Sequence, residues 1–265
     1  MMTKKQKELI YRTVDKMIDN TSHQLKLDKL IKKHNQKLHF IPKRYRIFGG
    51  ILQSLNIQFG NFIEELMTNL IENDDRYEIL YSYSGKKSNA FTLSDKNDEI
   101  IDQYISKCQV EVNMNSNNEF EKLKNEIVIN KNGKSRKFKH DIDLLFKEKS
   151  TGVIYYVEIK YNDDHDTGKF IDINRKLIKT YAYLIKEFEI DDVNKLVPIL
   201  FYFNNKKMKG NNYLPEETNI YRGKKFFDRF LKVKYDDLDR FLNEFSESDE
   251  NLMKFNSLYN SVMNL

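Results

Sequence analysis

Two apolar segments that carry ionisable side chains constrain the fold of this chain more than any other feature. They read DIDLLF from Asp141 and VIYYVEIK from Val153, and the connection KEKSTG contains a glycine. Short β-rich segments separated by such a turn predict an antiparallel hairpin, with strands over Asp141–Phe146 and Val153–Tyr161. Buried ionisable groups are costly unless they are paired or bind a metal, so their presence in these strands needs an explanation.

Strand geometry predicts that these charges gather at one place. Side chains alternate between the two faces of a strand, so Glu158 and Lys160 share a face, as do Asp141 and Asp143. Pairing of the two strands brings Asp143 close to Glu158. The sequence therefore predicts two carboxylates and an ammonium group converging at one end of the hairpin.

Such a group of side chains suits the hydrolysis of a phosphodiester bond. Hard divalent cations such as Mg²⁺ prefer carboxylate oxygens, and we expect Asp143 and Glu158 to be the ligands. The backbone carbonyl of Ile159 offers a further ligand, and Asp141 is an alternative to Asp143. Lys160 then positions the attacking water and neutralises charge on the phosphorus. The alternative is a surface hairpin whose charges are only solvated.

The remaining pattern predicts an α/β or α+β core, of which we adopt α/β, with a helical N-terminal part at residues 1–75, a core at 110–205 and a C-terminal part at 206–265. We treat these three parts as one domain. Helices are expected over residues 1–35, 47–73 and 235–245, and over Thr167–Phe188, with Thr167 as the cap. Strands are expected at 110–114, 125–130 and from Leu196, with a turn at Asn132–Gly133.

Composition limits the class of protein. Of 265 residues, 40% are hydrophobic and 32% charged, which is typical of a globular chain rather than a disordered one. The single cysteine, Cys108, excludes a disulfide framework within one chain and favours a cytoplasmic location. We expect neither a signal peptide nor a membrane span, because no run of roughly 18 apolar residues occurs. A net charge of +5 is compatible with a polyanionic partner or with a solvated surface.

The acids and the lysine resemble the active-site motif of the PD-(D/E)XK nuclease superfamily. The motif reads Asp143, then Glu158-Ile159-Lys160, although Ile142 stands where the superfamily usually has a proline. Gly60 and Glu64, in FGNFIEEL, resemble a Gly-X-X-X-Glu pattern on the helix before the sheet. The resemblance implies a mixed central sheet flanked by helices, an N-terminal helical extension, and Glu64 as an outer-shell metal ligand.

Longer segments resemble type II restriction endonucleases of the HinfI-like group, which is related to the TdeIII group. These segments are FGGILQSLNIQFGNFIEELM, HDIDLLF, YYVEIKYNDDHDTGKF and DINRKLIKTYAYL, within Phe48–Glu187. The resemblance implies Mg²⁺-dependent cleavage of both strands of unmethylated duplex DNA at GANTC. A palindromic target implies a homodimer, and host protection implies a cognate DNA methyltransferase.

Contacts to DNA are expected from basic and amide side chains. Those on the helix after the motif are Lys169, Arg175, Lys176 and Lys179, and those in the loop NNKKMKGNNYLP are Asn211 and Asn212. The acidic stretch NDDHD at Asn162–Asp166 is a weaker metal or DNA candidate, since it lacks the EF-hand spacing. Two other functions stay open: a repair or junction-resolving nuclease of the same superfamily, and a DNA-binding protein without catalysis.

Overall fold

The chain folds into two compact units. A computed structural model describes residues 2–22, 24–36, 38–87, 89–111 and 115–264. The first unit comprises Met1–Leu66 and Val233–Leu265, and the second comprises Met67–Lys232. The boundary lies within the long helix α3 (Lys43–Glu72).

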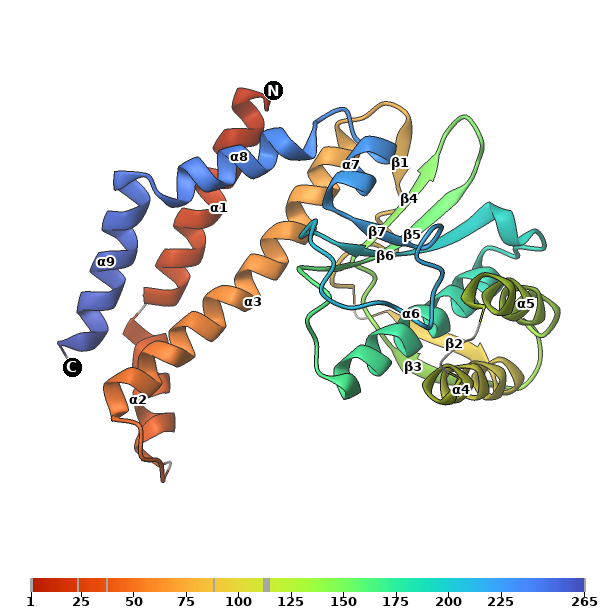
Figure 1. Ribbon diagram of the computed structural model, residues 1–265, viewed down its shortest axis with the longest axis horizontal. Coiled ribbons are helices and arrows are strands. Elements are labelled where there is room, and N and C mark those ends of the chain that lie inside the picture. Colours follow the sequence, from red (N-terminus) through yellow and green to blue (C-terminus); the bar gives the residue numbers. More distant parts are fainter. Residues whose placement is uncertain (1, 23, 37, 88, 112–114, 265) are drawn as a thin grey trace. The chain divides into compact units, whose positions relative to one another are not determined.

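The second unit is built on a five-stranded mixed sheet with the strand order β1-β4-β5-β6-β7 (Figure 1). The strands are β1 (Tyr77–Ile79), β4 (Leu144–Glu148), β5 (Ile154–Lys160), β6 (Leu196–Tyr202) and β7 (Ile220–Arg222). β4 pairs antiparallel with β1 and β5, whereas β5, β6 and β7 run parallel. A separate antiparallel ladder joins β2 (Ala90–Ser94) to β3 (Ser135–Lys139). This mixed sheet with flanking helices confirms the fold class expected from the sequence.

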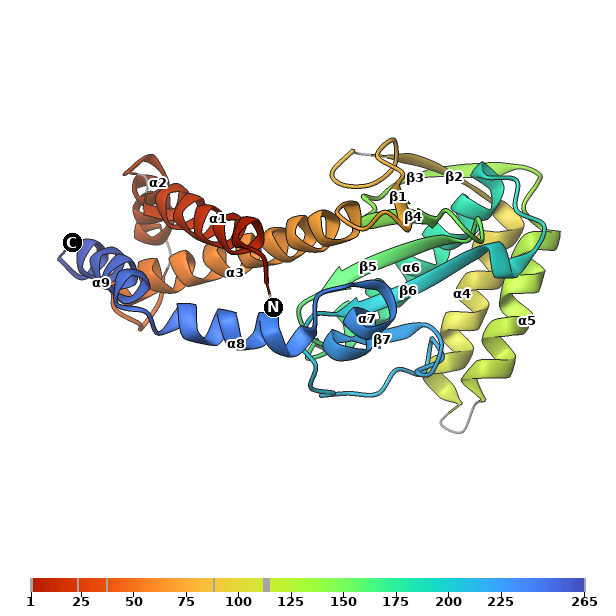
Figure 2. The same cartoon turned by 90° about the horizontal axis from the view of Figure 1, so that it is seen from above.

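Helices cover both faces of this sheet. On one face lie α4 (Asp95–Val110), α5 (Ser116–Ile129) and the crossover helix α6 (Thr167–Glu187), and α4 and α5 run side by side (Figure 2). Leu177 and Tyr181 of α6 are buried in the same core as Tyr156. On the opposite face, the aromatic rings of α7 (Gly223–Phe230) pack against the sheet, for example Phe230 on Tyr155. Successive residues of β5 therefore face two different cores.

The β4–β5 hairpin is formed by local backbone geometry and by its register. Gly152 adopts a positive φ of 72°, which a glycine tolerates without strain, and its N–H bonds the Glu148 carbonyl at 2.8 Å. Leu144 pairs with Val157 across the ladder. The residue before Leu144 therefore lies opposite Glu158, which sets the geometry of the candidate site.

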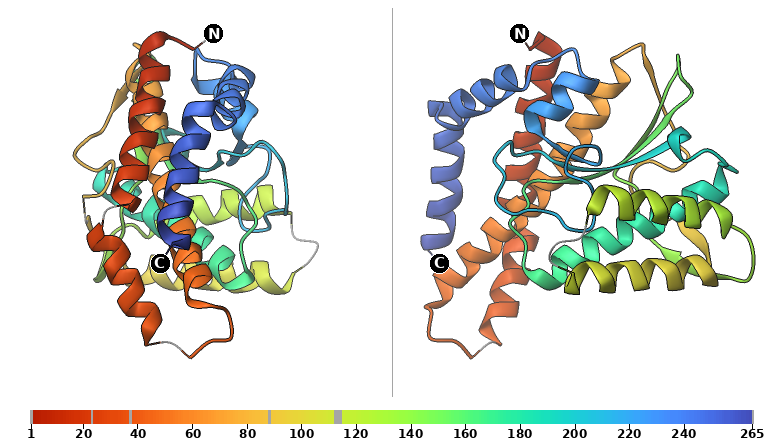
Figure 3. Two further views of the ribbon diagram at one scale, coloured as in Figure 1. Left: turned by 90° about the vertical axis from the view of Figure 1, so that its left-hand side faces the viewer. Right: turned by 45° about the vertical axis from the view of Figure 1, so that its right-hand side comes forward.

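The first unit is entirely helical. It contains α1 (Lys4–Ser22), α2 (Gln24–Asn35), most of α3, α8 (Tyr235–Ser246) and α9 (Asp249–Met263). Its core joins Ile47 and Ile51 of α3 to Leu258 and Val262 of α9, and α1 runs beside α9 (Figure 3). These helices confirm the predicted N-terminal helical part and the predicted helix at 235–245.

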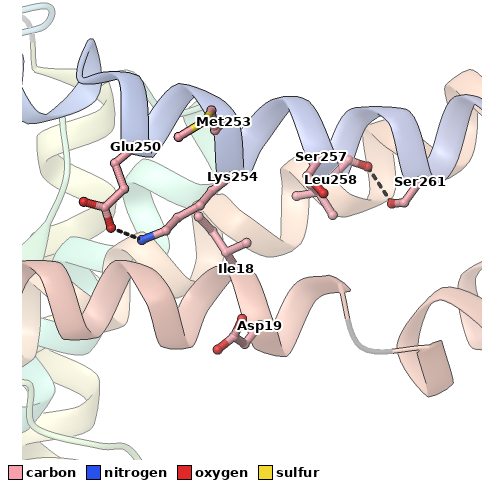
Figure 4. A pocket seen from close by; sticks show the side chains of 8 residues that line it. All are labelled: Ile18, Asp19, Glu250, Met253, Lys254, Ser257, Leu258 and Ser261. Atoms are coloured by element: carbon pink, nitrogen blue, oxygen red, sulfur yellow. Dashed lines mark hydrogen bonds and ion pairs between the residues drawn. The ribbon is translucent and has the colours of Figure 1, made fainter.

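A groove in the first unit lies between α1 and α9 (Figure 4). Ile18 and Leu258 supply apolar surface there, and Lys254 contributes a charge. The ammonium of Lys254 bonds Glu250 at 2.8 Å and also pairs with Asp15. Lys254 is thus paired with two carboxylates of the helical unit.

Of the strands predicted at 125–130 and 110–114, the first is wrong, and the second lies partly outside the described residues. Residues 125–130 contain a β-branched run, yet residues 125–129 belong to helix α5, whose start is capped by the Asn115 side chain accepting from the Asn118 N–H. Phe120, Leu123 and Ile127 recur at helical spacing and are buried, so the helical period prevails over the short β-branched run. Of the strand predicted at 110–114, Val110 ends helix α4 and residues 112–114 lie outside the described residues.

Element boundaries differ from the predictions at the motif itself. β4 begins at Leu144 rather than Asp141, because Ile142 forms isolated bridges with Ser84 and Gly85 instead. The cap of α6 is Asp166, whose side chain accepts from the Lys169 N–H at 2.9 Å, while Thr167 is the first helical residue. The helix ends at Glu187, one residue earlier than predicted.

Candidate active site

The hairpin brings Asp143, Glu158 and Lys160 to one place at the end of β5. The Lys160 ammonium lies 2.7 Å from Glu158 Oε1, 3.4 Å from Asp143 Oδ2 and 2.8 Å from the Ile159 carbonyl oxygen. The Ile159 N–H donates to Asp143 Oδ2 at 2.7 Å. Three oxygens from two strands thus surround one cationic group, as the predicted pairing requires.

The second carboxylate oxygen of Glu158 is held from the interior. The Tyr156 hydroxyl donates to Glu158 Oε2 at 3.3 Å, and His140 Nε2 lies 3.4 Å from the same oxygen. Tyr156 is fully buried, and Glu158 is only 5% exposed. These contacts fix the plane of the carboxylate so that Oε1 is directed toward Lys160 and Asp143.

The buried pair of Glu158 and Lys160 is charged. Burial by itself raises the pKa of Glu158, but attraction to Lys160 and the contact with His140 lower it to about 2. Burial by itself lowers the pKa of Lys160, but Glu158 and Asp143 raise it above its ordinary value. Lys160 therefore retains its proton at neutral pH and acts in this arrangement as a cation and hydrogen-bond donor.

The donor set fits a hard divalent cation. Asp143, Glu158 and the Ile159 carbonyl offer only oxygen atoms, the ligand type that Mg²⁺ prefers. All three oxygens contact the ammonium of Lys160, so they already surround a positive charge. Across the part of the chain that the structure describes, no group of three or more His, Cys, Asp or Glu side chains could hold a metal. A backbone carbonyl or water is therefore needed to complete such a site.

Asp143 makes the contacts that join the two strands at the site. The backbone N–H of Ile159 and the side-chain ammonium of Lys160 both donate across the hairpin to Asp143 Oδ2. Asp141 lies two residues farther from β4, beyond Ile142. The geometry favours Asp143 as the first metal ligand.

Nearly the whole chain is similar in sequence to known proteins. The sequence model of the type II restriction endonuclease family HinfI matches residues 2–246. The type II restriction enzyme HinfI of Haemophilus influenzae is 58% identical over 256 residues, which cover 97% of each chain. The chain belongs to the HinfI family. No solved structure matches it.

Membership of the HinfI family confirms the expected class of enzyme, a site-specific deoxyribonuclease. It supports restriction rather than repair or binding without cleavage, the two alternatives that the sequence left open. Type II restriction endonucleases generally need a divalent metal, in agreement with the oxygen-rich site. Among the described residues, no helix has the length and apolarity needed to cross a membrane.

The four basic residues of α6 that were predicted to contact DNA differ in their ion pairs and in their exposure. In this HinfI-family chain, Arg175 and Lys179 form ion pairs with Asp102 of α4, at 3.2 Å in each case, and so lie on the face that packs against α4. Lys176 pairs with Asp172 one turn away, whereas Lys169 is exposed near the start of the helix. Lys169 and Lys176 are thus better placed for a DNA backbone than the other two.

The two asparagines predicted for base contacts lie in different surroundings. Asn211 is buried, and its side chain bonds Asn174 of α6 and accepts from the N–H groups of Tyr213 and Leu214. These bonds give it a structural part in holding the loop. Asn212 is exposed.

Glu64 lies on α3 within the first unit and is partly exposed. The site side chains belong to the second unit, and the role of Glu64 as an outer-shell ligand stays a prediction.

Sequence reasoning missed the supporting residues. Tyr156 shares a face with Glu158, and the period-two alternation that placed Glu158 and Lys160 could have included it. His140 was noted only as adjacent to the motif. Asp163 of the NDDHD stretch is buried and bonds Arg222 at 2.9 Å, so its carboxylate already has a cationic partner in the interior. No local signal indicates that Arg222 is its partner.

Proposed function

We propose that this chain cleaves both strands of duplex DNA at GANTC with Mg²⁺ bound between Asp143, Glu158 and the Ile159 carbonyl. The observation that carries the proposal is the convergence of three oxygens, from Asp143, Glu158 and the Ile159 carbonyl, on the ammonium of Lys160. A Mg²⁺ ion bound there polarises a phosphoryl oxygen and lowers the pKa of a bound water. The resemblance to HinfI implies GANTC as the target.

In this proposal each side chain has a separate part in hydrolysis. Asp143 and Glu158 bind the metal, and the ammonium of Lys160 donates to the attacking water and offsets the charge that develops on the phosphate. Tyr156 and His140 keep Glu158 oriented through its second oxygen. Lys169, Lys176 and Asn212, which are exposed, contact the DNA.

The assembly follows from the symmetry of the target. A two-fold symmetric site cut on both strands favours a homodimer, because each copy then presents one site to one strand. A cytoplasmic enzyme of this specificity requires a methyltransferase that protects the same sequence in the host. Sedimentation of the purified protein with and without a GANTC duplex tests the dimer.

The decisive experiment is digestion of an unmethylated plasmid. Wild-type protein with Mg²⁺ should give discrete bands whose ends map to GANTC, and EDTA should abolish them. Lys160→Ala should also abolish cleavage, whereas Lys149→Ala, an exposed lysine in the turn of the same hairpin, should cut normally. Equal activity of the Lys160→Ala and wild-type proteins would contradict the proposed site, and cutting confined to branched DNA would favour the repair nuclease.

A further inference from the structure

The segment between β6 and β7, residues 203–219, begins directly beside the catalytic lysine. We call it the β6–β7 loop. Tyr202 pairs with Lys160 in the parallel ladder. The next two residues continue this pairing, since the Phe203 N–H bonds the Lys160 carbonyl at 2.8 Å and the Asn204 N–H bonds the Tyr161 carbonyl at 2.7 Å. The start of the loop is therefore fixed to the strand that carries the active-site residues.

A buried carboxylate holds the middle of the loop. Asp163, whose side chain is 2% exposed, accepts from the N–H groups of Met208 at 2.9 Å and Lys209 at 3.1 Å. Asp163 also accepts from Arg222 Nη2 at 2.9 Å. One side chain thus anchors the backbone of the loop to the residues that follow β5.

Arg222 connects this anchor to the second half of the loop. Its Nη1 donates to Glu216 Oε2 at 2.8 Å, and Glu216 Oε1 accepts from the Asn211 N–H at 3.1 Å. We call Asp163, Arg222 and Glu216 the clamp. The clamp ties both halves of the loop to the catalytic strand.

A buried charge network such as the clamp adds little net stability to a fold. Removing charges from water is costly, and well-packed apolar residues are often as stabilising as a buried ion pair. A network that instead binds several backbone N–H groups fixes the loop in one position. The side chains left exposed include Lys206, Met208 and Asn212.

Two of the exposed side chains have the chemistry of base contacts. Lysine donates to the O6 and N7 acceptors of guanine, and asparagine pairs with the N6 and N7 edge of adenine. Both bases occur in GANTC. Lys206 and Asn212 lie on either side of the residues held by Asp163, so the clamp sets the spacing between them.

We propose that the β6–β7 loop reads bases of the target through Lys206 and Asn212, and that the clamp is the positioning device that makes this reading specific. The proposal rests on the proposed function, namely cleavage of DNA at GANTC. In this proposal Asp163, the buried acid of the NDDHD stretch, contributes to recognition of the target sequence rather than to metal binding.

The test compares cleavage of matched and mismatched duplexes. One duplex contains GANTC, and the others have one G·C or one A·T pair of that site exchanged. Asp163→Asn keeps the shape of the side chain but removes its charge, and it should reduce the ratio of kcat/KM between matched and mismatched duplexes by about tenfold or more. Asn212→Ala, an exposed change, should reduce the same ratio by a similar factor. Affinity for a duplex without the site should stay within about twofold in both.

A matched control separates positioning from general stability. Asn97→Ala removes a buried side chain of the same unit that donates to the Ile127 carbonyl at 3.0 Å on α5. It should lower the melting temperature but leave the cleavage ratio unchanged. A fall in the ratio equal to that of Asp163→Asn would overturn the proposal.

The outcomes distinguish the two proposals. If the wild type cuts at GANTC and neither loop variant lowers the ratio, the loop proposal is wrong and the proposed function stands. If Asp163→Asn does not fold, Asn212→Ala decides alone, because an unchanged ratio overturns the proposal. A wild type that cuts no DNA with Mg²⁺ refutes the proposed function, and the loop proposal with it.

Discussion

Removal of one buried hydroxyl group tests how Glu158 is oriented. Tyr156→Phe deletes only the oxygen that donates to Glu158 Oε2 at 3.3 Å. Burial raises the pKa of Tyr156, so the hydroxyl is neutral and donates throughout the working range of pH. A hydrogen bond to a charged acceptor contributes about 1.5–3 kcal/mol. We expect the lower end, since the bond is long and His140 remains 3.4 Å from the same oxygen.

A loss of about 1.4 kcal/mol in the transition state corresponds to about tenfold in rate. Single-turnover cleavage of a GANTC duplex at saturating Mg²⁺ measures this rate without a contribution from product release. The matched control is Tyr155→Phe, because Tyr155 faces the opposite core and its hydroxyl accepts from Arg229 Nη2 at 3.3 Å. Tyr155→Phe should change the rate by less than about twofold.

Equal rates for the two variants would refute the proposed role of Tyr156. The role would also be refuted if the loss of cleavage rate in Tyr156→Phe disappeared when the variant and the wild type were assayed at the same temperature interval below their own melting temperatures. In the first case the orientation of Glu158 would depend on His140 and Lys160 alone. In the second case the hydroxyl would stabilise the core without affecting the site.

Three further predictions follow from the same geometry. Asp143→Ala should abolish cleavage while Asp141→Ala retains measurable activity, and equal residual activity in the two would contradict the assignment of the metal ligand. Burial raises the pKa of Glu158, but the contacts with Lys160 and His140 together lower it to about 2, so its stabilising effect is complete above about pH 4.5 and is lost as the pH falls toward 2. Melting temperatures between pH 5 and 3 should therefore fall more steeply for the wild type than for Glu158→Gln, and identical slopes would refute this. Leu258→Ala should cost about 2–5 kcal/mol in the helical unit, measured by urea unfolding, because Leu258 is 4% exposed in its core.

The sequence predicted the convergence of the candidate-site residues better than it predicted their surroundings. Asp143, Glu158 and Lys160 come together through one hairpin, whose register follows from strand alternation and a short turn. The clamp could not be predicted in the same way, because Asp163 and Arg222 are 59 residues apart and meet only after β6 and β7 join the sheet. Long-range pairs of this kind leave no periodic pattern in the chain.

The helix at 116–129 shows a second limit of prediction. Ile127, Val128 and Ile129 form a short β-branched run of the kind found in strands, and this local pattern favoured the wrong element. Phe120 and Ile127 are buried on one face of α5, in the core beneath α6, and this tertiary burial determines the structure. Short polar strands such as β3 were missed because their stability comes from pairing with β2 rather than from their composition.

The β4–β5 hairpin has a consequence for the order in which the chain folds. Asp143 meets Ile159 and Lys160 across separations of 16 and 17 residues, whereas β6 can join β5 only after the whole of α6 has crossed over the sheet. Contacts that are close in sequence close their loops quickly, so the charged residues pair while the hairpin is still surrounded by water. The rest of the core then packs around an ion pair that has already formed. The growing core thus never has to enclose an isolated carboxylate, and folding avoids the most costly intermediate that this arrangement of charges could produce.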